Sequence, residues 1–187
     1  MSDMPTRRRA LLSCLISQDM TLEGLLNNAR QLQRDLTQGS IMRDVLEPHG
    51  DEIVDMQRTQ LLEGKGSDGK DIHPFYTEDL KPSGYFRSRA KAENYRAWKQ
   101  TLSYPKNVQR NSDAPNLYIT GVFHNDLNVA FYGDSVAIVP DTAYAANIMR
   151  KYGMNIFGLS MLSWGVIFNE KGAKDDLIIK MREVLWQ

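Results

Sequence analysis

The chain has 187 residues, of which 42% are hydrophobic and 25% are charged. This length fits one domain with an extension better than two domains, and the composition excludes a disordered or collagen-like chain. Lys and Arg together number 23, and Asp and Glu also number 23, so the formal net charge is zero. Any electrostatic attraction to a partner must therefore come from charges concentrated in one part of the chain.

The beginning of the chain carries three arginines, Arg7 to Arg9, before the apolar run Ala10 to Ile16. Only about four residues separate Arg9 from Cys14, whereas a signal peptide has an apolar region of about 7 to 15 residues. We therefore expect an uncleaved chain made in the cytoplasm. Because Cys14 is the only cysteine, an internal disulfide and a multi-cysteine metal site are excluded. No run approaches the roughly 18 apolar residues of a membrane helix.

The first regular element in chain order is a helix. Leucines and an alanine recur at helical spacing over residues 22–36, with Thr21 in position to cap the N-terminus and Gly39 just beyond the C-terminus. A second, short helix is predicted up to Leu46, with Ser40 as its N-cap.

The next segment, residues 53–62, fits the period of a helix in one part and that of a strand in another. We interpret it as a strand because it precedes residues 64–70, a glycine-rich run that commonly reverses an extended chain. Residues 72–84 contain two prolines and few apolar side chains, which indicates an extended irregular loop.

The middle of the chain predicts one further helix and most of the β-structure. Ser88 is in position to cap a helix, and residues 117–120 are typical of a short strand. Alternating apolar residues in 127–131 and 136–138 flank Gly133-Asp134, a favourable two-residue turn. This last pattern predicts a β-hairpin.

The C-terminal third is predicted to be helical. Residues 143–152 favour a short helix closed by Gly153, and Ser160 can cap a following helix. Gly172 interrupts the pattern before a final helical period over residues 177–185.

The order of these elements does not alternate as in a parallel α/β protein. It predicts an α+β fold, in which a small antiparallel sheet with a hairpin is packed by several helices and carries extended loops or arms. We place a helical extension at residues 1–50 and the α+β domain at residues 51–187.

Motifs for catalysis or metal binding are weak throughout. The three histidines, His49, His73 and His124, lack the spacing of metal ligands, and none has a plausible nucleophile beside it in sequence. Residues 67–71 have the start of a calcium loop without its spaced acids and terminal Glu, so a turn explains them better. We expect no catalytic residue, no metal and no cofactor, and therefore no enzyme.

Positive charge is concentrated between residues 81 and 110. This stretch contains eight basic residues and one acid, Glu93, and aromatic residues lie among them. The basic residues are Lys81, Arg87, Arg89, Lys91, Arg96, Lys99, Lys106 and Arg110. Such a stretch has the chemistry of phosphate neutralisation and base stacking. A helix with an aromatic, core-facing side and a solvated basic side explains the same residues better.

Several loose motifs follow one another in an order that resembles a known family. A glycine-rich turn leads into residues 72–77, and Asn116 to Phe123 contains the pair Thr120-Gly121. The hairpin then precedes Tyr144-Ala145-Ala146 and Lys151-Tyr152-Gly153. From Glu52 to Ser160 this succession is similar to tail-completion and virion-morphogenesis proteins of tailed bacteriophages, in a variant from phages and prophages of gut Bacteroidetes.

The sequence departs from the family pattern at several positions. Phe123 stands where the family commonly has Leu, and Arg150-Lys151-Tyr152 replaces a usual His before the last glycine. The matching family positions are Thr120, Gly121, Phe123, Tyr144, Tyr152 and Gly153. The N-terminal extension is longer than is typical of the family.

The resemblance implies a structural role in the virion, as a ring-forming head-to-tail connector, neck or tail-completion component without an active site. Its expected partners are copies of itself, portal, neck or tail proteins, and DNA passing through a central channel. Residues 72–84 and the arginine-rich start are candidate arms between subunits. Arg87, Arg89, Arg96 and Lys99 would then contact a neighbouring subunit or DNA. The alternative is a soluble nucleic-acid-binding accessory protein that uses residues 81–110.

Overall fold

The computed structural model describes residues 21–132 and 135–187. These form an α+β fold in which helices accompany one two-stranded antiparallel sheet. In chain order the elements are α2 (Leu22–Thr37), α3 (Ser40–Leu46), the 3-10 turn η1 (Glu47–His49), α4 (Gly50–Leu62), α5 (Arg89–Gln100), α6 (Val122–Asn125), β1 (Leu127–Tyr132), β2 (Ser135–Pro140), α7 (Ala145–Tyr152), the 3-10 turn η2 (Met154–Ile156), α8 (Met161–Asn169) and α9 (Ala173–Leu185).

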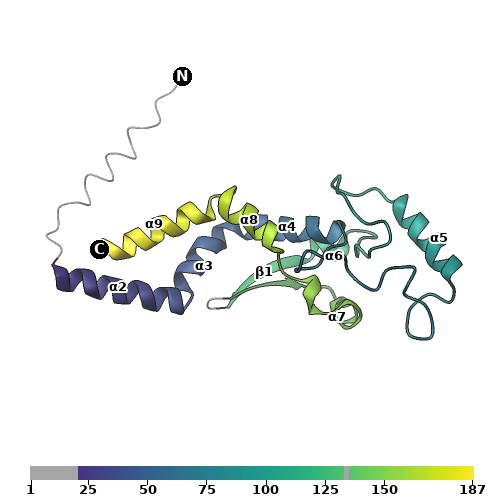
Figure 1. Cartoon of the computed structure of the whole chain (residues 1–187), viewed down its shortest axis with the longest axis horizontal. Coiled ribbons are helices and arrows are strands. Elements are labelled where there is room, and N and C mark those ends of the chain that lie inside the picture. The colour runs from purple at the N-terminus through teal and green to yellow at the C-terminus, as the bar shows by residue number, and fades with distance from the viewer. Residues whose placement is uncertain (1–20, 133–134) are drawn as a thin grey trace, which may run out of the picture.

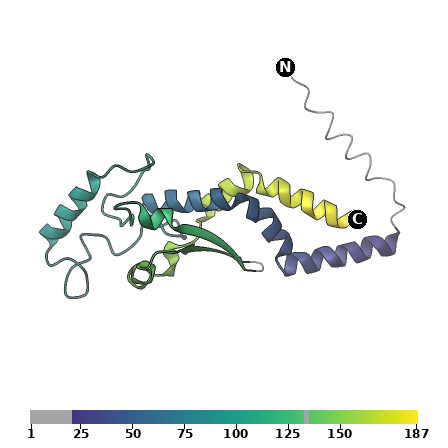
Figure 2. The ribbon, with the colours of Figure 1, turned by 180° about the vertical axis from the view of Figure 1, so that it is seen from behind.

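The molecule is elongated (Figure 1). Helices α2 and α9 lie side by side at one end, while α4, α8 and the sheet form the middle, and α5 stands at the other end (Figures 1 and 2). We call the α2 and α9 pair the helical arm. Its two helices pack along each other, and the Asn28 side chain donates a hydrogen bond to the Leu185 carbonyl across 3.2 Å.

Most of the predicted helices are confirmed. The hydroxyl of Thr21 accepts from the Gly24 amide at 3.1 Å, as expected for an N-cap, and the Ser88 and Ser160 hydroxyls cap α5 and α8 in the same way. Gly153 ends α7. None of the described helices is both long and apolar enough to cross a membrane.

The predicted cap of the second helix is wrong by one residue. Gly39 occupies the N-cap position of α3 in a left-handed conformation, with φ at 74°. Ser40 is instead the first helical residue, and its hydroxyl donates to the Asp35 carbonyl of the preceding helix. A left-handed turn of this kind favours glycine because it has no Cβ.

The strand predicted over residues 53–62 is also wrong, because this segment forms the greater part of α4. Its buried residues follow the helical period, and they are Ile53, Val54, Gln57, Gln60, Leu61 and Leu62. Gln57 and Gln60 hide this period in the sequence, since a buried glutamine counts as polar in any hydropathy pattern. The glycine-rich run that follows is still a turn, closed by a bridge between Lys65 and Asp71.

The two buried glutamines hold the segment that leads into α8. The Gln57 side chain donates to the Ile156 carbonyl at 3.0 Å and accepts from the Gly158 amide at 2.9 Å. Gln60 likewise donates to the Gly158 carbonyl and accepts from the Ser160 amide, both at 2.9 Å. Two side-chain amides thus satisfy four backbone groups of residues 156–160, a segment that no strand of the described fold pairs with. We call these four bonds the glutamine clasp.

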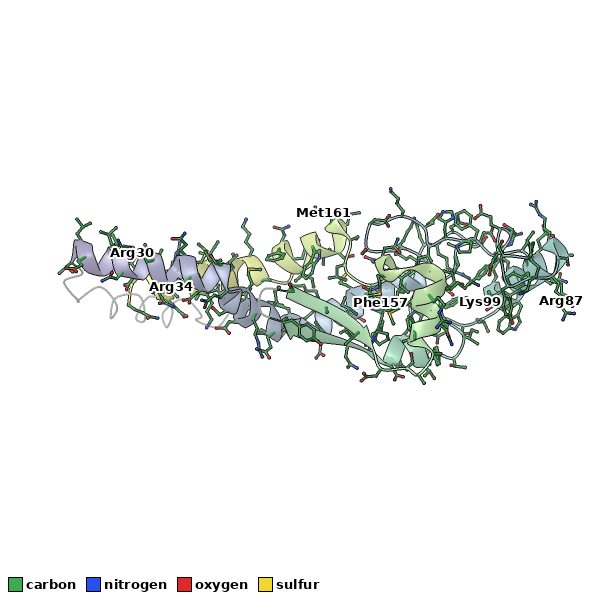
Figure 3. The ribbon with its side chains drawn as sticks, turned by 90° about the horizontal axis from the view of Figure 1, so that it is seen from below. Arg30, Arg34, Arg87, Lys99, Phe157 and Met161 are labelled. Atoms are coloured by element: carbon green, nitrogen blue, oxygen red, sulfur yellow. The ribbon has the colours of Figure 1, made fainter. Side chains whose placement is uncertain are left out.

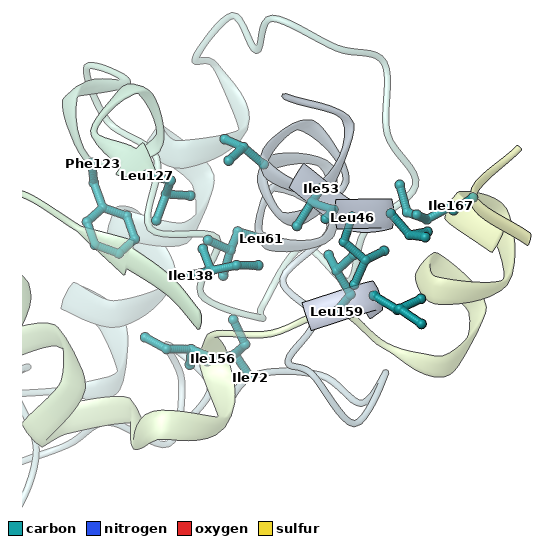
Figure 4. Packing of buried hydrophobic residues seen from close by; sticks show 14 of the residues in the cluster. Leu46, Ile53, Leu61, Ile72, Phe123, Leu127, Ile138, Ile156, Leu159 and Ile167 are labelled. Carbon is teal, nitrogen blue, oxygen red and sulfur yellow. The ribbon is translucent and has the colours of Figure 1, made fainter. Parts of the chain in front are cut away.

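The predicted hairpin is confirmed. Strand β1 pairs with β2 in antiparallel register from Leu127 with Pro140 to Tyr132 with Ser135. The predicted turn residues Gly133-Asp134 lie outside the described residues. Leu127 and Ile138 point one face of the hairpin into the core, where α4 packs against β1 (Figure 4).

The short strand predicted over residues 117–120 is wrong. This segment forms a bend in which Leu117 has a left-handed φ of 54°. The side chain of the fully buried Asn116 accepts from the Tyr118 amide at 3.3 Å, which stabilises a local turn instead of a ladder.

Residues 72–84 are irregular, as predicted, but they are not free of their own chain. Ile72 is buried in the main core, and Tyr76 is buried in a second, smaller cluster. The Tyr76 amide also donates to the Asp113 carbonyl at 3.0 Å. The expectation of a loosely held arm is therefore wrong for this loop, because two large side chains anchor it. The other candidate arm, at Arg7 to Arg9, lies outside the described residues, as does Cys14.

The main core runs along the inner side of α4. It joins residues before position 50, such as Leu32, Val45 and Leu46, to Ile53 and Leu61 and onward to the hairpin and α8 (Figure 4). The helical extension and the α+β part thus share one apolar cluster.

The glutamine clasp yields a prediction about stability. In the Gln57→Leu variant the Ile156 carbonyl and the Gly158 amide lose their partners inside the protein. Since an unpaired buried polar group costs about 1–3 kcal/mol, the free energy of unfolding should fall by about 2–4 kcal/mol in urea denaturation. The control, Gln109→Leu, changes an exposed glutamine and should move it by less than about 0.5 kcal/mol. Equal effects of the two substitutions would contradict the role of the clasp.

Candidate functional site

Helix α5 rests on the second apolar cluster, which consists of Tyr76, Phe86 and Ala92 with Leu80 and Tyr95 packed against it. The Tyr95 ring lies 5.2 Å from the Tyr76 ring and 5.3 Å from the Phe86 ring, measured between centroids. Tyr95 also contacts Trp98 at 5.4 Å. The aromatic residues at helical spacing thus do face a core, as the structural alternative expected, although Trp98 stays 43% exposed.

The outer side of this end is basic. Arg87, Arg89 and Lys91 are exposed, and Arg96 is half-buried. The Arg89 guanidinium lies 3.1 Å from the Glu93 carboxylate, one turn along the helix. Tyr85 is 70% exposed beside these residues. We call this surface the basic–aromatic end, consisting of Tyr85, Arg87, Arg89, Lys91, Arg96 and Trp98; Figure 3 labels Arg87 at the tip.

Lys99 was predicted to belong to this contact surface, and that prediction is wrong. The side chain is almost fully buried and its ammonium donates to the Tyr118 carbonyl. Burial, with a smaller effect of the nearby Arg110, lowers the pKa of Lys99 to about 8. The Tyr104 hydroxyl in turn donates to the Lys99 carbonyl at 2.5 Å. Lys99 therefore links α5 to the loop before α6. Of the four basic residues predicted for this contact, only the three arginines remain at the surface.

His124 is a buried residue that sequence reasoning assigned to no site. It is 3% exposed, and its two ring nitrogens have no hydrogen-bond partner among the described residues. Burial lowers the pKa of His124 to about 4, with smaller contributions from Lys99 and Arg58. The Arg58 guanidinium donates to the carbonyls of His124 at 2.7 Å and Asn125 at 3.1 Å. Nothing in the sequence pattern distinguished this histidine from the other two.

Asp79 is a second buried group that the sequence did not indicate. It accepts from the Lys151 ammonium on α7 and from the Tyr85 amide at 2.9 Å. Burial lowers the pKa of Lys151, but the hydrogen bond to Asp79 outweighs burial and leaves this pKa raised. The pair joins α7 to the start of the basic–aromatic end.

The residues of the family resemblance fall around α6 and α7. Phe123 is buried and its ring lies 6.3 Å from that of Tyr144. Gly121 has a φ of 85°, and a Cβ there would lie 3.2 Å from the Tyr118 ring, so glycine suits this position. Thr120 is exposed. The structure thus brings Phe123 and Tyr144 together and places Thr120 on the surface.

The two remaining residues of this set belong to the end of α7. Tyr152 is half-buried against the main core, and Lys151 lies over its ring at 5.1 Å. Gly153 follows with a φ of 84°, which ends the helix.

The helical arm at the opposite end exposes apolar side chains. On α2 these are Leu22, Leu25, Leu26 and Leu36, and on α9 they are Ile178, Ile179 and Trp186 at its C-cap. Leu22 is 75% exposed and Leu26 is 50% exposed. Several large apolar side chains exposed at one end of a molecule are more typical of an interaction surface than of a monomer exterior. This face, which we call the arm face, was not among the predicted sites, although the helix itself was.

Within residues 21–132 and 135–187, no three His, Cys, Asp or Glu side chains are grouped closely enough to hold a metal ion. No protein-family model matches the chain, and neither a curated protein nor a solved structure matches it.

The burial of His124 predicts a pH dependence of stability. Because its pKa is about 4 in the folded chain, against 6.5 ordinarily, the unfolded chain gains a proton first as the pH falls. His124 therefore contributes stability above about pH 6.5 that is lost toward pH 4. In urea denaturation between pH 7 and 4.5, the His124→Phe variant should lose less stability than the wild type. His73→Phe, at an exposed histidine, should follow the wild-type curve; parallel curves for all three proteins would contradict this account.

Proposed function

We propose that this chain is a structural component of a tailed-bacteriophage virion, forming a ring at the head–tail junction, neck or tail end. In this role it acts through its shape and its contacts, and it transforms no substrate. It would be made in the host cytoplasm and incorporated into the virion.

One observation carries the proposal: the elongated chain has two chemically different exposed surfaces at opposite ends. The arm face is apolar, whereas the basic–aromatic end combines arginines with an exposed Tyr85 and Trp98. Figures 1 and 3 show that the helical arm and α5 lie at opposite ends of the molecule. A closed ring of identical subunits needs two unlike surfaces on each chain, one for each neighbour. An isologous dimer would need only one self-complementary patch.

The internal bracing suits such a role. The main core runs from the arm helix α2 to the hairpin and α8, and the Asp79–Lys151 pair continues the connection toward the basic–aromatic end. Both exposed surfaces are thus fixed to one continuous body. Portal, neck or tail proteins would contact the flat sides of the ring, and DNA would pass through its channel.

The ring proposal predicts a loss of assembly from one substitution on the arm face. Leu26→Glu places a charge on this exposed apolar surface and should convert an assembled species into monomers in size-exclusion chromatography with light scattering. Since Leu26 is half exposed, the free energy of unfolding should change by less than about 1 kcal/mol. Asn27→Glu, which adds the same charge at an exposed polar position next to it, should assemble like the wild type.

Electron microscopy tests whether the assembly has the cyclic symmetry of a ring. Negative-stain electron microscopy of the recombinant chain, and of virions that carry it, should show a cyclic ring. A wild-type chain that remains monomeric at every concentration, alone and with portal or tail proteins, would contradict the proposal.

A second function, binding of nucleic acid, is favoured by the exposed Tyr85 and Trp98 among arginines. It predicts that binding to duplex or single-stranded DNA weakens steeply with salt. The slope of log K against log salt is negative, and each lost phosphate contact makes it less steep by about 0.9. Arg87→Ala with Arg89→Ala should therefore make the slope less steep by about 2. Lys70→Ala with Lys174→Ala, at exposed lysines elsewhere, should leave it unchanged. Binding that is absent or independent of salt would contradict this function.

A further inference from the structure

Opposite charges lie in separate parts of this chain although its net charge is zero. Residues 44–55 contain five acids and no Lys or Arg, whereas residues 81–110 contain eight Lys or Arg and one acid. The acids are Asp44, Glu47, Asp51, Glu52 and Asp55. The chain therefore has an acidic side and a basic side that can attract each other between molecules.

The fold keeps the basic–aromatic end apart from the first acids of α4 within one molecule. Asp51 and Glu52 lie in the first turn of α4, and α5 stands beyond the C-terminal end of that helix (Figures 1 and 2). At a rise of 1.5 Å per residue α4 is about 20 Å long. The basic–aromatic end of a chain therefore does not reach its own Asp51 and Glu52.

The acidic side forms a recess rather than a flat surface. A depression of about 280 Å³ is lined by Asp51, Glu52, Asp55, Met56 and Lys171. Asp51 and Glu52 have no ion pair among the described residues. Carboxylates beside a methionine suit a basic side chain, because the charged head pairs with the oxygens while the aliphatic stem packs on the apolar wall.

A contact of this chemistry already exists within the chain. Lys106, which belongs to the basic stretch 81–110, places its ammonium 2.5 Å from the Asp55 carboxylate and 3.1 Å from the Thr59 hydroxyl. It occupies one carboxylate of the recess. Lys171 also lines the recess, but the other two carboxylates, one turn toward the N-terminus of α4, form no ion pair among the described residues.

Helix α5 presents an unpartnered face that fits this recess. It buries only Ala92 and Lys99, and Arg87 and Lys91 at its start are exposed without an ion pair among the described residues. Trp98 adds an exposed aromatic ring on the same helix.

We propose that the basic–aromatic end of one copy docks on the acidic recess of a second copy, with Arg87 and Lys91 facing Asp51 and Glu52. This inference rests on the proposed ring and assigns the acidic recess of a neighbouring copy as the surface that receives the basic–aromatic end, while the arm face makes a separate contact. The contact joins unlike surfaces, so each copy retains a free acidic side and a free basic side for the next subunit.

Charge complementarity favours a second copy over nucleic acid as the occupant. The acids of residues 44–55 would repel phosphates that approach along the molecule, whereas they attract the basic end of another copy. The burial of Lys99 also removes one of the cations that a phosphate backbone would use.

The test is a charge exchange between two variants. Variant B carries Arg87→Glu with Lys91→Glu, and variant A carries Asp51→Lys with Glu52→Lys. In sedimentation velocity at low salt, each variant alone should associate at least about tenfold more weakly than the wild type. In a mixture of A and B, the new lysines of A can pair with the new glutamates of B. The mixture should therefore associate more strongly than either variant alone. The chain carrying all four substitutions should assemble again. Far-ultraviolet circular dichroism verifies that each variant is folded.

A matched control carries Lys70→Glu with Lys174→Glu, which makes the same change of charge at exposed lysines that line neither surface. It should associate like the wild type. If A and B alone both assemble like the wild type, the docking is wrong and the ring survives. If the wild type never associates, both are wrong. If B assembles normally but loses binding to duplex DNA, nucleic acid is the occupant and the docking is wrong.

Discussion

The structure depends on the hydrogen bonds that two glutamines of α4 form with residues 156–160, a segment that pairs with no strand of the described fold. Residues 156–160 cross the core without a ladder, and the side chains of Gln57 and Gln60 supply the hydrogen bonds that a strand would have given. Buried backbone groups must be paired, so this clasp fixes where the hairpin side of the fold meets α8. Helices α8 and α9 follow from that point, and α9 in turn supports α2. The position of the helical arm therefore depends on the buried side-chain amides of Gln57 and Gln60.

Buried charged groups also connect separate segments of the chain. Lys99 binds a carbonyl of the loop before α6, and Asp79 joins Lys151 to the start of the basic–aromatic end. Each bond joins a helix to a segment of irregular conformation, α5 to the loop at Tyr118 and α7 to the loop at Asp79. Together with the second aromatic cluster, these bonds hold α5 at a distance from the main core and keep its basic side exposed.

An elongated shape with separated charges has a direct physical consequence for assembly. In the proposed docking the acids in the first turn of α4 would meet the cations at the start of α5 in a neighbouring copy, because the length of α4 separates these groups within one molecule. The apolar arm face adds a non-directional attraction at the other end. Under the proposed ring, these exposed surfaces would hold neighbouring copies together.

The pattern of the sequence determined the helices with apolar faces and serine or threonine caps, and it determined the hairpin, because these depend on neighbours a few residues apart. It also marked the excess of positive charge at residues 81–110. Only the tertiary structure decided that residues 53–62 are helical, that Lys99 is buried, that residues 72–84 are anchored and that the arm face is exposed. The physical reason is common to all four: burial of a polar group, or exposure of an apolar one, depends on partners about 20 to 150 residues away in the chain, and local patterns do not record them.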